Sequence, residues 1–125
     1  MNQNIKVIPL KPSQPQSNRK TAKNQLMTGT FPAEIVDVDQ APDYDQDEAV
    51  QITYMVDTGT KSVEYKEIFI NDQRNSRTNN FINQLSADGV SMNSWDELVG
   101  VKVEVTFKKQ VKYGRTYLNI VAYKF

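Results

Sequence analysis

Runs in which apolar and polar residues alternate occupy most of the chain from residue 29 onward. The clearest run places Val50, Ile52, Tyr54 and Val56 between Gln51, Thr53 and Met55. This period of two is typical of a strand with one buried face, because successive side chains of a strand point to opposite sides of the sheet. Runs of this kind, and β-branched or aromatic ones, predict five strands, at residues 29–38, 50–56, 63–70, 101–108 and 116–125.

A helix is predicted between the third and fourth strands. Ser76 is a suitable N-cap, and Gly89 is placed to end the helix. Its apolar face would comprise Phe81, Ile82 and Leu85. A second short turn is predicted at Ser94, because Glu97 completes the pattern of a capping box.

Three strands, a helical insert and two further strands follow one another in the chain order of the OB-fold, a partly open Greek-key barrel. The sequence therefore predicts an all-β domain with a small helical insert, in which a five-stranded OB-fold barrel spans residues 28–125. Residues 1–27 carry basic residues, three prolines and no acid, and they have little apolar content after Leu10. This composition predicts a flexible basic N-terminal arm, because it cannot bury enough surface to offset the entropy of ordering.

Composition excludes several classes of chemistry. The chain has no Cys and no His, which removes thiolate nucleophiles, imidazole bases and the usual zinc ligands. The acidic segment 40–48 begins like a calcium loop, but Glu48 stands where that motif needs Gly, and Tyr54 stands where it needs Glu. We therefore expect no metal, no cofactor and no enzymatic activity. No apolar run is long enough for a membrane span, so we expect a cytoplasmic protein without a membrane partner.

Several segments carry a resemblance to a known family: residues 64–69 (Glu-Tyr-Lys-Glu-Ile-Phe), the helix 78–87, the Leu-Val-Gly at 98–100 and the Tyr-Leu-Asn-Ile-Val at 117–121. Through them, the stretch from Gly29 to Phe125 resembles the OB-fold single-stranded DNA-binding proteins of phages, conjugative plasmids and integrative elements of Gram-positive bacteria. The resemblance implies sequence-tolerant binding that coats single-stranded DNA during transfer or replication of a mobile element.

Single-strand binders need cations along the phosphates and flat rings beneath the bases. The turn between the last two strands has both, and its candidate DNA-binding residues are Lys108, Lys109, Lys112, Tyr113, Arg115 and Tyr117. A second candidate group, on the second and third strands and just after them, comprises Tyr54, Tyr65, Lys66, Phe69, Arg74 and Arg77. Tyr54 is in phase with apolar neighbours and could instead belong to the core, whereas Phe69 is out of phase with Ile68 and Ile70, which predicts an outward ring.

The arm contains one apolar patch, formed by Ile5, Val7, Ile8 and Leu10. We expect this patch to contact a neighbouring copy, so that molecules associate along DNA; an inert tail is the alternative. Two other functions stay open at the level of sequence. One is an OB-fold protein–protein adaptor in a DNA-transfer complex, and the other is a metal-dependent nuclease that uses the acidic segment.

Overall fold

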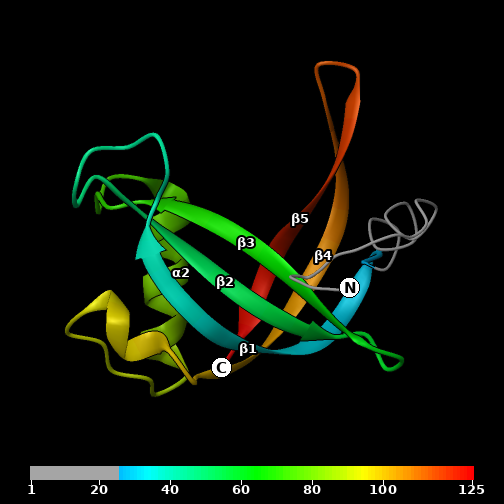
Figure 1. Cartoon of the computed structure of the whole chain (residues 1–125), viewed down its shortest axis with the longest axis horizontal. Coiled ribbons are helices and arrows are strands. Elements are labelled where there is room, and N and C mark those ends of the chain that lie inside the picture. The colour runs from blue at the N-terminus through cyan, green and yellow to red at the C-terminus, as the bar shows by residue number, and fades with distance from the viewer. Residues whose placement is uncertain (1–25) are drawn as a thin grey trace, which may run out of the picture.

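The computed structural model describes residues 26–125 and contains one antiparallel sheet with one α-helix (Figure 1). The strands are β1 (Gly29–Gln40), β2 (Ala49–Asp57), β3 (Ser62–Ile70), β4 (Lys102–Lys112) and β5 (Arg115–Lys124). Between β3 and β4 in chain order lie helix α2 (Ser76–Ala87) and the short 3-10 helix η1 (Trp95–Leu98). The prediction of a mostly β chain with five strands is confirmed, since each alternating run forms a strand.

The strands are ordered β3-β2-β1-β4-β5, and every neighbouring pair is antiparallel. Strand β1 therefore lies at the centre and pairs with both hairpins. Its pairing with β2 begins at Ala33, whereas its pairing with β4 begins at Gly29. Pro32 thus lies where β1 has a neighbour on one side only, which suits a residue that has no N–H to donate.

Backbone pairing does not close this sheet, because β3 and β5 form its two edges. Side chains link the two edges instead. The Tyr65 hydroxyl donates to the Leu118 carbonyl at 3.2 Å, and the Tyr123 hydroxyl donates to the Glu67 carboxylate at 2.6 Å. We call this line of contacts the β3–β5 seam. The OB-fold barrel that the sequence predicts is therefore not confirmed, although side chains of the two edges are in contact.

Helix α2 begins one residue earlier than predicted. Asn75, not Ser76, is the N-cap, and its side-chain oxygen accepts the Thr78 backbone N–H at 3.0 Å. Asn75 caps the helix because its side chain reaches the Thr78 N–H while its own backbone is extended. Gly89 follows the helix with φ +84°, as a residue that ends a helix does.

The predicted capping box at η1 is only partly formed. The Ser94 hydroxyl accepts from the Asp96 backbone N–H, one residue earlier than the pattern requires. Glu97 accepts from the Asn93 N–H rather than from Ser94. Both side chains still satisfy free N–H groups around the start of η1.

Aromatic rings join the helix to the sheet. Phe69 of β3 and Phe81 of α2 are fully buried, with ring centroids 4.6 Å apart. Trp95 stacks on both rings and covers this part of the core from η1. The buried core comprises Ala33, Ile35, Val50, Ile52, Tyr54, Val56, Phe69, Phe81, Leu85, Leu98, Val103, Val105, Phe107 and Ile120. Within residues 26–125, no helix has the length and apolar content needed to cross a bilayer.

Candidate functional site

The end of the β4–β5 hairpin projects from the body of the protein (Figure 1). Pairing between β1 and β4 stops at Phe107, whereas β4 continues to Lys112 and pairs there with β5 alone. Residues 108–119 therefore form a two-stranded ribbon, and in the part of the chain that is described neither of its edges pairs with another strand.

The ribbon turns through Tyr113 and Gly114, whose φ values are +54° and +74°. Positive φ at both central residues is the requirement of a type I′ hairpin turn, which favours Asn-Gly and matches the twist of the strands. A tyrosine in this conformation is uncommon, because its Cβ crowds the backbone. Tyr113 is also 93% exposed, so its ring stands in solvent at the tip.

The cross-strand register decides which side chains of the ribbon share a face. Lys108 pairs with Asn119, and Lys112 pairs with Arg115. Because paired residues lie on one face and faces alternate along a strand, the same side carries Lys108, Gln110, Lys112, Arg115, Tyr117 and Asn119. We call this set the basic face. Lys109 lies on the opposite side, which continues the core-facing side of Phe107.

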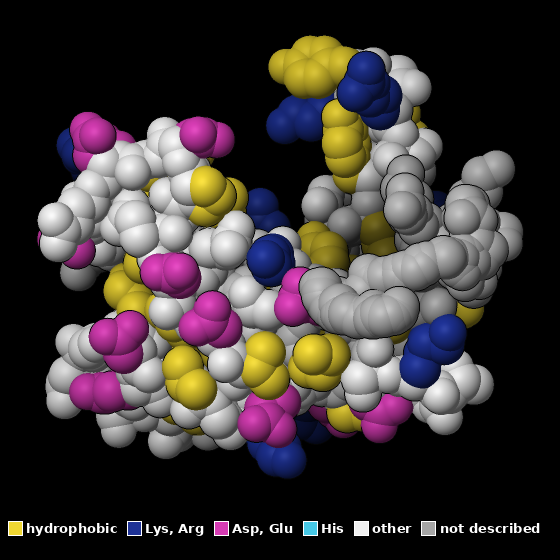
Figure 2. All heavy atoms as spheres, viewed as in Figure 1, with side chains coloured by type: hydrophobic (Ala, Val, Ile, Leu, Met, Phe, Trp, Pro, Cys, Tyr) yellow, Lys and Arg dark blue, Asp and Glu magenta, His cyan; other side chains and the backbone are white. Residues whose placement is uncertain are grey.

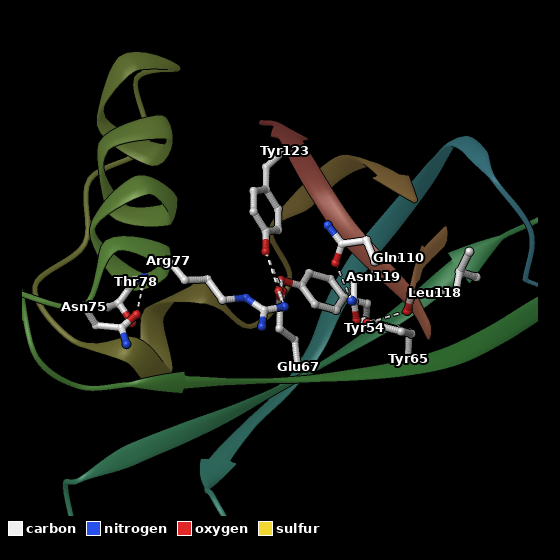
Figure 3. Close-up of polar contacts among 10 residues, drawn as sticks. All are labelled: Tyr54, Tyr65, Glu67, Asn75, Arg77, Thr78, Gln110, Leu118, Asn119 and Tyr123. Carbon is white, nitrogen blue, oxygen red and sulfur yellow. Dashed lines mark hydrogen bonds and ion pairs between the residues drawn. The ribbon is translucent and has the colours of Figure 1, made fainter. Parts of the chain in front are cut away.

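An amide pair within the basic face was not predicted from sequence. The Asn119 side-chain amide donates to the Gln110 side-chain oxygen at 2.7 Å (Figure 3). This bond leaves the Asn119 oxygen, one Asn119 N–H and both Gln110 N–H groups available, between the cations and beside Tyr117. The spacing of Gln110 between Lys108 and Lys112 was a usable signal, since residues two apart in a strand share a face.

The rings predicted on β2 and β3 lie on the inner side of the sheet. Tyr54 and Phe69 are both fully buried, so neither can stack on a base. The outward orientation predicted for Phe69 is wrong, because Ile68 is the residue that points out, with 36% exposure. Tyr65 is half-buried, and its ring meets Phe107 edge-on at 5.0 Å in the β3–β5 seam.

Glu67 was missed as a central residue of this inner side. Its carboxylate is 3% exposed and accepts the hydroxyls of Tyr54 at 2.9 Å and Tyr123 at 2.6 Å (Figure 3). The Arg77 guanidinium contacts the same carboxylate at 2.5 Å from helix α2. We call these four residues the Glu67 cluster. The sequence contains one signal for this position, since Glu67 is in phase with Tyr65 and Phe69, but it indicates an inner side chain only once the inner parity of β3 is known.

Burial and the Glu67 charge keep both phenols of this cluster protonated. Burial first, and the nearby carboxylate second, raise the pKa of Tyr54 and of Tyr123. Burial by itself would lower the pKa of Arg77, but the Glu67 carboxylate raises it on balance. The predicted DNA contact Arg77 therefore serves the interior of the protein, with about half of its side chain exposed.

The two other cations predicted on and after β3, Arg74 and Lys66, also have acidic partners. The Arg74 guanidinium donates two hydrogen bonds to Asp72, at 3.2 and 2.9 Å. These bonds first, and the Arg74 backbone N–H second, lower the pKa of Asp72 to about 2. Lys66 lies on the outer side of β3 at 3.9 Å from Glu64. The structure therefore does not bring Lys66, Arg74 and Arg77 together into one basic path.

The outer side of β1, β2 and β3 is acidic and apolar, as Figure 2 shows in a view onto these strands. In register, its carboxylates are Glu34, Asp37, Asp39, Asp57 and Glu64, with Glu104 beside them on β4. They outnumber the lysines of this side, which are Lys66, Lys102 and, paired with Glu104, Lys124. We call this side the acidic sheet face. It presents no aromatic ring on β2 or β3, so a DNA path across these strands is not supported.

No protein-family model and no curated protein matches the chain. The resemblance to single-strand binders of mobile elements therefore stays a proposal that the residues alone carry.

Two predicted groups need separate mention. The expected oligomer contacts Ile5, Val7, Ile8 and Leu10 lie outside the described residues. In the described range, no three carboxylates gather closely enough to hold a metal ion.

Proposed function

We propose that the protein binds single-stranded DNA with little sequence preference and without catalysis, through the basic face of the β4–β5 ribbon. The observation that carries the proposal is the register that places Lys108, Lys112 and Arg115 on one face with Tyr117. Cations can follow the phosphates there while the Tyr117 ring, 43% exposed, supports a base. By the family resemblance, this activity would coat DNA during transfer or replication of a mobile element.

The proposal includes an OB-type barrel as the scaffold. In its support, β1 pairs with both β2 and β4, and side chains of the β3–β5 seam bridge the two strands that would close such a barrel. The ribbon then corresponds to the loop between the fourth and fifth strands, one of the two loops with which OB-folds hold oligonucleotides. The other such loop, residues 41–48, is acidic here and favours binding at the ribbon alone.

The salt dependence of binding tests this assignment. Each phosphate contact with a single strand contributes a slope of about −0.7 to log affinity against log salt, so three cations on the basic face should give about −2. We expect Lys112→Ala to reduce the slope by about 0.7. Lys109→Ala removes the same charge from the opposite face and should leave the slope almost unchanged. Fluorescence anisotropy with labelled oligo-dT measures both. A flat salt response, or equal effects of the two variants, contradicts the assignment.

Tyr113→Asn should have opposite effects on stability and binding. Asparagine tolerates positive φ far better than tyrosine, so we expect the variant to be more stable by about 0.5–1 kcal/mol. Affinity for oligo-dT should fall by about 1 kcal/mol, because the exposed ring is lost. Thermal unfolding and anisotropy on the same preparation check both signs. A stable variant with unchanged affinity would mean that the ring at the tip does not contact DNA.

A protein–protein adaptor is the second candidate. It is favoured by the unpaired edges of the ribbon, to which an extended peptide could add a strand. This function does not require the cations to share a face. If the protein does not bind oligonucleotides at low salt, that result would favour the adaptor function.

A further inference from the structure

The acidic sheet face has no partner among the described residues, and the sequence contains a segment that complements it. Residues 1–25 carry Lys6, Lys11, Arg19, Lys20 and Lys23 and no acid. Residues 5–11 also combine two of these cations with the chain's apolar patch. We propose that residues 5–11 dock on the acidic sheet face of their own chain. This inference needs no DNA and stands apart from the proposed function.

Charge on the receiving surface is the first argument. Two of its carboxylates are already engaged, since Lys102 contacts Glu34 at 3.6 Å and Lys66 contacts Glu64 at 3.9 Å. Asp37 and Asp57 make no ion pair with any described residue, and Asp57 only accepts the Gly59 N–H within its own turn. The face therefore retains negative charge that a basic segment can neutralise.

Apolar surface is the second argument, because charge alone would not distinguish residues 5–11 from the rest of the basic segment 1–25. Val36 and Ile68 are 38% and 36% exposed on this side of the sheet. A hollow of about 260 Å³ also opens where β1 runs past the end of β2. Pro32, Ala33 and Met55 supply its apolar wall. Its charged rim comprises Glu34, which Lys102 of the same rim contacts, and Asp57, which has no ion pair with a described residue. Such a site fits an aliphatic side chain that is followed by a cation, as in Leu10-Lys11.

The length of residues 12–25 favours docking of residues 5–11 on their own chain over docking on a second copy. The hollow borders Pro32, only a few residues beyond Leu26, where the described chain begins. Residues 12–25 could span about 40 Å at about 3 Å per residue, which is more than such a short return requires. A tethered segment acts at an effective concentration of about millimolar, so its own chain competes favourably with other copies.

The ribbon does not suit residues 5–11 as a binding surface, because it is basic, as a DNA-binding surface must be. Its cations would repel a segment that contains Lys6 and Lys11. We therefore expect residues 5–11 to bind away from the ribbon. Docking would cover the surface that most strongly repels a polyanion, and leave the basic face open.

A spin label near the segment provides the test. The chain has no native Cys, so Asn4→Cys gives one attachment point beside residues 5–11. In isotope-labelled full-length protein, we expect the amides of Glu34, Thr53 and Met55 to lose most of their NMR intensity. Amides of the ribbon should retain theirs. Broadening of the ribbon, or no localised broadening, would overturn the proposal.

Two controls sharpen this experiment. Asp37→Lys should restore the intensities, whereas Asp45→Lys makes the same charge change in the exposed loop 41–48 and should not. A mixture of spin-labelled protein with isotope-labelled, label-free protein reports only contacts between copies, and we expect no broadening there. Broadening in the mixture alone would assign the segment to a second copy and overturn docking in the same chain. Because DNA is absent throughout, failure here leaves the salt test of the ribbon unaffected.

Discussion

Glu67→Ala is expected to destabilise the protein by about 2–4 kcal/mol, because a buried hydroxyl left without its acceptor costs about 1–3 kcal/mol and the variant leaves two of them. The carboxylate accepts from Tyr54 and Tyr123 and contacts Arg77, so its loss affects all three partners. The buried Tyr54 hydroxyl would have no water to replace its acceptor. The Arg77 side chain is about half exposed and can turn to solvent. Loss of its ion pair should therefore contribute the smaller part of the destabilisation.

Glu64→Ala is the matched control. It removes the same side chain from the outer side of β3, where its contact with Lys66 is long and exposed, and should cost less than about 1 kcal/mol. Urea unfolding of both variants gives the comparison. Glu67→Gln should fall between them, because an amide oxygen still accepts from a phenol. Similar stabilities of Glu67→Ala and Glu64→Ala would exclude the Glu67 cluster as a structural centre.

Tyr117→Ala is expected to weaken binding of oligo-dT by about 1–3 kcal/mol, or about 5- to 150-fold, if a base rests on its ring. Tyr117 lies in the middle of the basic face, paired with Gln110 and between the cations. Tyr117→Phe should bind almost as well as the original protein, because the flat face survives without the hydroxyl.

Thr116→Ala is the control for position, since Thr116 pairs with Val111 on the opposite side of the ribbon. We expect it to leave the affinity unchanged. Anisotropy titrations should be paired with thermal unfolding, so that a loss of binding is not a loss of folding. Folded Tyr117→Ala protein with full affinity would remove stacking on β5 from the proposal.

The strands could be predicted from sequence because alternation is a local property that burial of one face imposes. The sequence could not predict which side chains of β3 point into the core. Both parities of this strand contain apolar residues, so Ile68 and Ile70 suggest one inner side, and Tyr65 and Phe69 suggest the other. Charge does not decide between them, because Glu64 and Lys66 lie on one parity and Glu67 lies on the other. Only the tertiary partners Tyr123 and Arg77 make that carboxylate acceptable inside.

In β5, a bulge breaks an otherwise regular alternation. Thr106 pairs with Ala122, but Phe107 pairs with Ile120, so Val121 is the extra residue. Strict alternation from Leu118 would put Tyr123 on the outer side, whereas the bulge returns it to the inner side beside Ile120. Nothing in the local sequence marks this position. The basic face was easier to locate, because it lies beyond the bulge, next to a recognisable turn.

The central position of β1 has a consequence for how the chain reaches this structure. Each hairpin, β2–β3 and β4–β5, closes through a short local turn. Contacts between β1 and β4 instead join residues far apart in the chain, such as Gly29 and Phe107, and carry most of the loop-closure entropy. We therefore expect formation of the β1–β4 ladder to limit the rate of folding. The ribbon, which makes only local pairs, can form early or late without changing that barrier.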